Sequence, residues 1–287
     1  MYESLGDICS RAEEKKITFW EVILEDDCVE RQLEREASFA QMKTMYLAMK
    51  DADASYDPAL ESRSGLTGRD GGKMEQYVNG GDTLCGDFIG RVMEKAVKMG
   101  ESNACMKRIV AAPTAGACGV VPAVLLAMQD KYGFTDEKMT EALYVAAGIG
   151  GVIASRAFIA GAQGGCQAEI GSASSMAAGA AVYLRGGDAK AISHAAAMAM
   201  KNLLGLVCDP VAGLVEVPCV KRNVSGAVVA LAAADMALAG VYSRIEPDEV
   251  IDAMREVGLS MPACMRETSE GGLAATPTGI RAKERLQ

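Results

Sequence analysis

Residues 161–184 read GAQGGCQAEIGSASSMAAGAAVYL, and two stretches of the same kind follow, AISHAAAMAMKNLLGLV at 191–207 and SGAVVALAAADMALAG at 225–240. From residue 145 to residue 240 only 11 of 96 residues are charged, about half the 23% of the whole chain. Alanine is a strong helix former, and small side chains let helices approach each other closely. A helix that is apolar on most of its faces belongs in the middle of a protein. These stretches therefore predict a central core of helices rich in Ala, Gly and Met.

The segments on either side of this core are more charged. Apolar side chains recur at the spacing of one helix face over residues 17–50, which predicts amphipathic helices. Residues 51–81 are polar and rich in glycine, and such a composition is typical of a loop. No segment alternates apolar and polar residues for long, so β-strands are not expected.

Residues typical of helix ends predict two further helices. Asp82 is expected to cap a helix that Gly100 ends, and Pro247 suits the first turn of another that stops at Gly258. The sequence therefore predicts an all-α fold, organised as a single domain over residues 1–287. In this fold the more charged N- and C-terminal helices wrap the apolar core.

Composition and charge exclude several classes of protein. A net charge of -9 argues against binding to nucleic acid or to an anionic membrane. The uncharged stretch 170–184 has 15 residues, whereas a helix that spans a membrane needs roughly 18. The polar N-terminus, MYESLGDICSRAEEKK, does not have the pattern of a secretory signal. We therefore expect a cytoplasmic protein whose nine cysteines, an odd number, are not a disulfide framework.

Three cysteines differ from the others because polar residues and helix breakers surround them. Cys166 lies in GGCQAE, and Cys208 and Cys219 bracket CDPVAGLVEVPC. Their separations of 42 and 11 residues match no zinc ribbon or ferredoxin motif, so spacing alone leaves a thiolate site and buried core cysteines both open. If three thiolates held a cubane cluster, one iron would stay open to act as a Lewis acid on a substrate oxygen. Such an open iron favours a dehydration over electron transfer.

A second candidate is KRIVAAPTAGACGVVPAVL at 107–125, which predicts a tight turn before a helix. Backbone N–H groups in such a turn can bind a carboxylate, with Thr114 supplying a hydroxyl. An ordinary turn between two helices remains the alternative. His194, the only histidine, lies among Ala and Met and is expected in the core. Glu169 and Asp209, beside the cysteines, either orient ligands or cap helix ends.

Three motifs together resemble the iron–sulfur-dependent L-serine dehydratases (L-serine ammonia-lyases). They are IVAAPTAGACGVVPAVL at 109–125, GGCQAEIGSASSMAAGA at 164–180 and GLVCDPVAGLVEVPCVKRN at 205–223, and SGLTGRDGGKM at 64–74 resembles a further Gly-rich segment of the family. The likeness runs from about residue 10 to the C-terminus and corresponds to the catalytic alpha part. A beta part is absent from this sequence and is expected on a separate chain.

The resemblance implies an all-helical lyase that converts L-serine to pyruvate and ammonia with a 4Fe-4S cluster, as part of a hetero-oligomer with the beta chain. The cluster ligands that it implies are Cys166, Cys208 and Cys219, with Cys118 kept as a fourth cysteine near the site. We expect the substrate at Thr114, Ala115, Gly116, Ala117 and Asn223, and Lys107, Lys221 and Arg222 are weak candidates for catalytic groups. A related enzyme that acts on L-cysteine, or a subunit without a cluster that only assembles with a partner, are the alternatives.

Overall fold

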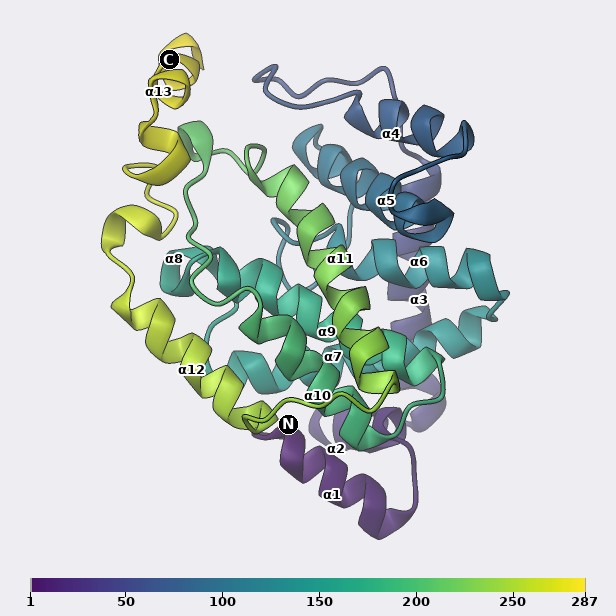
Figure 1. Ribbon diagram of the computed structural model, residues 1–287. Coiled ribbons are helices and arrows are strands. Elements are labelled where there is room, and N and C mark those ends of the chain that lie inside the picture. The colour runs from purple at the N-terminus through teal and green to yellow at the C-terminus, as the bar shows by residue number, and fades with distance from the viewer. Residues whose placement is uncertain (1, 287) are drawn as a thin grey trace.

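A computed structural model describes residues 2–286 and confirms the all-α prediction, because it contains thirteen α-helices and no β-strand within that range (Figure 1). The helices are α1 Leu5–Lys15, α2 Phe19–Arg31, α3 Arg35–Ala54, α4 Asp70–Asn79, α5 Gly86–Ala104, α6 Val120–Tyr132, α7 Asp136–Arg156, α8 Gly161–Gly164, α9 Ser172–Leu184, α10 Ala189–Lys201, α11 Cys219–Leu238, α12 Pro247–Ser260 and α13 Pro277–Leu286. A π-turn, η1 Gln167–Gly171, and three short 3₁₀ turns, η2 Val211–Gly213, η3 Ala263–Met265 and η4 Gly272–Ala275, connect them.

Helix α9 lies at the centre of the molecule, and every one of its residues is buried. Helices α6, α7, α10 and α11 pack around it. Ala and Gly on these helices allow close approach: a Cβ on Gly179 of α9 would lie 2.2 Å from Cδ1 of Ile149 on α7. The predicted core of Ala-, Gly- and Met-rich helices is therefore confirmed.

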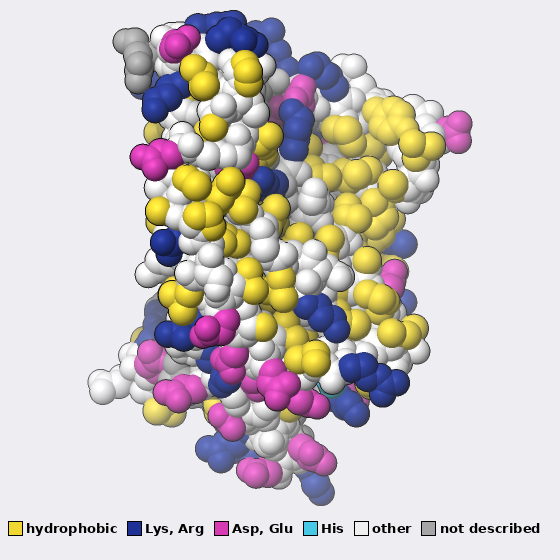
Figure 2. All heavy atoms as spheres, turned by 60° about the vertical axis from the view of Figure 1, so that its left-hand side comes forward, with side chains coloured by type: hydrophobic (Ala, Val, Ile, Leu, Met, Phe, Trp, Pro, Cys, Tyr) yellow, Lys and Arg dark blue, Asp and Glu magenta, His cyan; other side chains and the backbone are white. Residues whose placement is uncertain are grey.

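The charged N- and C-terminal helices lie outside this core, as expected. In Figure 1, α1 and α2 lie at the lower end of the molecule, while α12 follows its left edge and α13 lies at the opposite end from α1. Figure 2 shows acidic side chains gathered over the lower half of the face on which α12 and α13 lie. No helix within residues 2–286 is long and apolar enough to cross a membrane.

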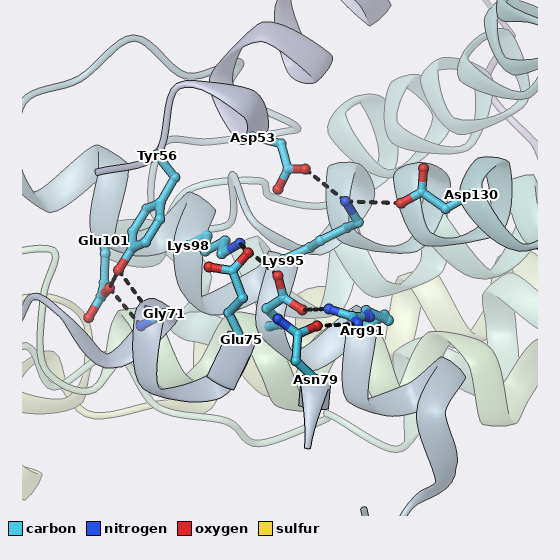
Figure 3. Close-up of polar contacts among 12 residues, drawn as sticks. Asp53, Tyr56, Gly71, Glu75, Asn79, Arg91, Lys95, Lys98, Glu101 and Asp130 are labelled. Atoms are coloured by element: carbon cyan, nitrogen blue, oxygen red, sulfur yellow. Dashed lines mark hydrogen bonds and ion pairs between the residues drawn. The ribbon is translucent and has the colours of Figure 1, made fainter. Parts of the chain in front are cut away.

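The predicted loop 51–81 was partly wrong, because α3 continues to Ala54 and residues 70–79 form α4. Helix α4 has no capping side chain of its own. Instead Glu101 of α5 accepts hydrogen bonds from the backbone N–H groups of Asp70 and Gly71, at 2.9 Å each, and from the Tyr56 hydroxyl at 2.6 Å (Figure 3). The first turn of α4 is thus satisfied by a carboxylate 30 residues away in the sequence.

A network of ion pairs, from buried to exposed, joins α4 and α5 to α3 and α6 (Figure 3). Lys98 is paired with Glu94 at 2.6 Å and with Glu75 of α4 at 3.1 Å. Lys95 bridges Asp53 of α3 at 2.7 Å and Asp130 of α6 at 3.1 Å. Because each buried cation has carboxylate partners, the network avoids the cost of an isolated buried charge.

The predicted boundaries of α5 and the predicted end of α12 were also wrong. Asp82 has a positive φ of 58° and does not cap α5, which begins four residues later at Gly86. Gly100 lies inside α5, where a Cβ would lie 3.1 Å from Cγ1 of Val220 on α11, so glycine serves helix packing there rather than helix termination. Helix α12 begins at Pro247 as predicted but continues through Gly258 to Ser260.

Candidate functional site

The structure brings two of the singled-out cysteines, Cys166 and Cys208, into contact, and the third, Cys219, lies near enough for the charge of Cys166 to act on it. Cys166 lies between α8 and η1, Cys208 lies in the loop after α10, and Cys219 is the first residue of α11. All three thiols are buried, with exposed fractions of 2%, 3% and 7%. The thiol of Cys208 donates a hydrogen bond to the sulfur of Cys166.

The environments of the three thiols differ in charge. The hydrogen bond from Cys208 and the positive charge of Arg222 lower the pKa of Cys166, although its burial opposes this. The same hydrogen bond, together with burial, raises the pKa of Cys208. Burial also raises the pKa of Cys219, to about 12. The pKa shifts of Cys166 and Cys208 are therefore opposite in direction.

Arg222 is the cation of this site. It projects from the first turn of α11 and hydrogen bonds to the Cys166 sulfur, to the Val207 carbonyl at 2.8 Å and to Asp209 Oδ1 at 2.9 Å. Asp209 is buried, and its other oxygen accepts a hydrogen bond from the Leu273 amide at 2.8 Å. Two roles were expected for Asp209, to orient ligands or to cap a helix end. This geometry favours the capping role, because Asp209 holds Arg222 and the first turn of η4.

Residues 261–276, here called the C-terminal strap, cover Cys208. The Cys208 amide donates to the Met265 carbonyl at 2.8 Å, and the Glu267 amide donates to the Cys208 carbonyl at 2.7 Å. Ser269 donates its hydroxyl hydrogen to the Pro210 carbonyl at 2.7 Å. The backbone of Cys208 is therefore held on both sides by a segment more than 50 residues further along the chain.

The turn at 114–119 lies beside the start of α11, and Asn223 joins the two. Its Nδ2 donates to the Gly116 carbonyl at 2.8 Å and to the Cys219 carbonyl at 2.9 Å, while its Oδ1 accepts from the Gly119 amide at 2.8 Å. Asn223 is 1% exposed, so all of its polar atoms serve to hold the turn. Among the hydrogen bonds of the described residues, none uses the Ala115 or Gly116 amide as a donor.

Glu169 connects this turn to the cysteines. Its Oε1 accepts a hydrogen bond from the Thr114 hydroxyl at 2.7 Å. A Cβ on Gly116 would lie 3.0 Å from the same oxygen, so the carboxylate packs directly on the turn. Burial raises the pKa of Glu169, the Thr114 hydroxyl opposes the rise, and the negative charge of Glu267 adds to it.

The Gly-rich segment at 64–74 also reaches the site, through the loop between Cys208 and Cys219. The hydroxyls of Ser62 and Ser64 both donate to Oε2 of the buried Glu216, at 2.7 and 2.5 Å. Asp70, at the start of α4, forms an ion pair with Lys221 at 3.1 Å. The segment thus supports the loop that leads to Cys219.

The other predicted residues lie further from the thiols or serve packing. Lys221 is exposed and turned to Asp70, and Lys107 is exposed with no ion pair among residues 2–286. Cys118 is fully buried, and its thiol donates a hydrogen bond to the Met99 carbonyl. His194 is buried on α10 and stacked on Tyr242, which confirms its expected place in the core.

Sequence reasoning missed three residues of the site: Glu267, Glu216 and Gly161. Glu267 lies in the C-terminal strap, outside the quoted motifs. Glu216 lies within the 205–223 motif, between two predicted ligands, but nothing in the local sequence marks it as buried. Gly161 is the first residue of α8. Its role depends on the absence of a side chain, because a Cβ there would lie 2.8 Å from Cys208 Sγ. Helix periodicity gives no signal for such a close approach.

The donor set suits a cluster better than a single ion. Within the described range, no three Cys, His, Asp or Glu side chains are arranged to hold one metal ion. In a cubane cluster each thiolate binds a different iron, so the sulfurs need not surround a single point. Three buried thiols beside one arginine, with no histidine near, provide soft donors and a compensating positive charge.

The fold and the site together define an all-α protein with a buried three-cysteine centre at the end of its helical core. The chain matches the family described as serine dehydratase alpha chain over residues 14–274. It therefore belongs to the serine dehydratase alpha chain family.

Several proteins of known name are similar to this chain over most or part of its length. It is 46% identical to a "Probable L-serine dehydratase, alpha chain" of Bacillus subtilis, across 100% of this chain and 95% of that protein. It is 50% identical to the "L-serine dehydratase, alpha chain" of Peptoniphilus asaccharolyticus, across 72% of this chain and 71% of that protein. It is 44% identical to an "L-serine dehydratase" of Streptomyces coelicolor, across 62% of this chain and 40% of that protein.

Proposed function

We propose that this chain is the catalytic alpha subunit of an L-serine dehydratase, a carbon–oxygen lyase that converts L-serine to pyruvate and ammonia. Membership of the family and the names of its relatives support this reaction. The observation that carries it is the convergence of Cys166, Cys208 and Cys219 from three segments into one buried centre.

Cys166, Cys208 and Cys219 would hold a 4Fe-4S cluster. When bound, the cluster supplies an open iron, a Lewis acid that makes the serine hydroxyl a better leaving group. Arg222, which hydrogen bonds to the Cys166 sulfur, would place a positive charge beside this ligand. Lys221 pairs with Asp70 at the start of α4 and stays a weak candidate for a catalytic group.

The substrate carboxylate would bind at the turn formed by Thr114, Ala115, Gly116 and Ala117. Within the described part of the chain the amides of Ala115 and Gly116 have no acceptor, so they are available to a carboxylate. Asn223 contributes indirectly, since it fixes this turn relative to Cys219. The turn and the thiols therefore form two ends of one substrate site.

A beta chain would complete the enzyme as a hetero-oligomer. The names of two relatives, which call them alpha chains, support a second kind of subunit.

The elimination product, an aminoacrylate, needs no enzyme to become pyruvate and ammonia, because it tautomerises and hydrolyses in water.

The test is anaerobic iron and sulfide analysis after reconstitution, followed by titration with L-serine under visible absorption. About four irons per chain and a spectrum that changes with L-serine are expected. Cys208→Ser is expected to abolish iron retention, whereas Cys28→Ser on α2, outside the site, keeps it. No iron in the wild-type protein would instead favour an assembly subunit, and faster pyruvate release from L-cysteine would favour the desulfidase.

A further inference from the structure

The side chain of Arg222 is bonded to the chain on both sides of Cys208. Its guanidinium donates one hydrogen bond to the Val207 carbonyl at 2.8 Å and another to Asp209 Oδ1 at 2.9 Å. These acceptors belong to the residues immediately before and after Cys208. Arg222 itself lies on the first turn of α11, three residues after Cys219. One side chain thus joins the loop of Cys208 to the helix that begins with Cys219.

The third cysteine is reached by the same group. The Arg222 guanidinium also hydrogen bonds to the sulfur of Cys166. A guanidinium presents its donors in a fixed planar fork, so it holds several acceptors at fixed relative positions, whereas the ammonium of a lysine has no such geometry. All three segments that carry predicted ligands are therefore connected through one cation, whose side chain is only 16% exposed.

Asp209 holds Arg222 in this orientation. Its side chain is 4% exposed, and both carboxylate oxygens are in use. Oδ1 accepts from Arg222, while Oδ2 accepts from the Leu273 amide at 2.8 Å. The carboxylate cannot turn away from Arg222 without leaving a buried group unpaired, which costs more than a normal hydrogen bond contributes.

The next residue of α11 holds the other part of the site. Asn223 donates to the Gly116 carbonyl and accepts from the Gly119 amide, so it fixes the turn at 114–119. Because Arg222 and Asn223 are consecutive, the cysteines and the turn are both anchored to the first turn of one helix. In the proposed function, the cysteines serve the hydroxyl end of L-serine and the turn serves its carboxylate end.

We infer that Arg222, oriented by Asp209, is a positioning residue that fixes the three cysteines relative to the carboxylate-binding turn. This inference rests on the proposed function and replaces the catalytic role first considered for Arg222. Loss of the guanidinium fork would misplace the cysteines and leave the turn in place, because Asn223 holds the turn independently. A misplacement of about 1 Å can lower turnover by about 10²-fold, even when the substrate still binds.

The first test uses the metal-free protein. Amide hydrogen exchange is followed by mass spectrometry in the wild type, in Arg222→Lys, which keeps the charge without the fork, and in Asp209→Asn, which keeps the guanidinium but weakens its anchor. Both variants should speed exchange in residues 205–209 about fivefold, as for the net loss of one hydrogen bond, and leave residues 117–119 unchanged. Arg255→Lys on α12 and Asp235→Asn on α11, both exposed, are the matched controls and should exchange as the wild type does.

The second test uses the anaerobically reconstituted enzyme. Iron loss to a chelator is followed by visible absorption, and turnover is expressed per bound cluster. Arg222→Lys and Asp209→Asn should each lose iron about tenfold faster than the wild type. Each should also lower kcat about tenfold and change KM for L-serine less than twofold. Asn223→Ala is the opposite case, because it releases the turn and should raise KM.

Three results would overturn the positioning role. They are exchange in residues 205–209 as slow as in the controls, faster exchange with an unchanged kcat, and a fall in kcat that is accompanied by an equal rise in KM. If Arg222→Lys retains no iron, Asp209→Asn decides together with exchange in the metal-free protein. Failure of the wild type to bind iron or L-serine would count instead against the proposed function.

Discussion

Asn223→Ala tests whether the turn at 114–119 and the first residue of α11 form one unit. The substitution removes three hydrogen bonds from a residue that is 1% exposed, and it leaves the Gly116 carbonyl and the Gly119 amide without their partner. At about 1 kcal/mol for each bond, the free energy of unfolding is expected to fall by about 3 kcal/mol. For a chain of this length the entropy of unfolding is about 0.6 kcal/mol/K, so the melting temperature should fall by about 5 °C.

The measurement is thermal unfolding of the metal-free protein followed by circular dichroism, with Asn202→Ala as control. Asn202 is exposed at the end of α10, and its loss is expected to cost less than 0.5 kcal/mol. In the reconstituted enzyme Asn223→Ala should also raise KM for L-serine, because the turn that binds the carboxylate is released. If both variants melted at the same temperature, the hydrogen bonds of Asn223 would not carry the stability that we assign to them.

Three further outcomes are expected. Glu216→Ala should speed amide exchange in residues 62–68, because the Ser62 and Ser64 hydroxyls lose their acceptor; exchange as slow as in Glu270→Ala would contradict this. Gly272→Ala should lower the urea midpoint more than Gly240→Ala does. Both glycines have a positive φ, but only at position 272 would a Cβ lie 2.4 Å from Asp209 Oδ2. Equal urea midpoints for the two variants would refute the clash. Burial lowers the pKa of His194, so the unfolded chain takes up its proton first and stability falls as pH drops below the usual histidine range. Unfolding in urea at pH 7.5 and 5.5 should show a smaller loss in His194→Gln, and an equal loss would exclude His194 as its source.

The core and the cysteine centre were predictable because their signals are local. An Ala-rich helix such as α9 has almost no polar face, and this pattern was enough to predict that it lies at the centre of the protein. Cys166, Cys208 and Cys219 stood out because glycine and proline interrupt the helices around them. What the spacing left open was whether the three would meet, and only the packing of α8, α11 and the strap brings them together.

The rest depended on partners distant in the sequence. Helix α4 begins with Asp-Gly-Gly, a poor helix start by propensity, and is stabilised by Glu101 from another helix. A glycine such as Gly100 often ends a helix, but here it allows close contact with Val220. Glu267 belongs to no motif, and its place in the site follows entirely from backbone bonds between the strap and Cys208.

The strap has a consequence for biosynthesis. Cys166 and Cys219 lie on the helical core, but the backbone of Cys208 gains its hydrogen bonds only from Met265 and Glu267. While the chain is still being translated, residues 261–276 remain within the ribosome after the core segments have emerged. The cysteine centre is therefore incomplete until residues 261–276 have emerged, and iron delivered before then would meet two ordered thiols and one on a free loop. Cluster insertion should accordingly wait for residues 261–276 rather than accompany synthesis of the core.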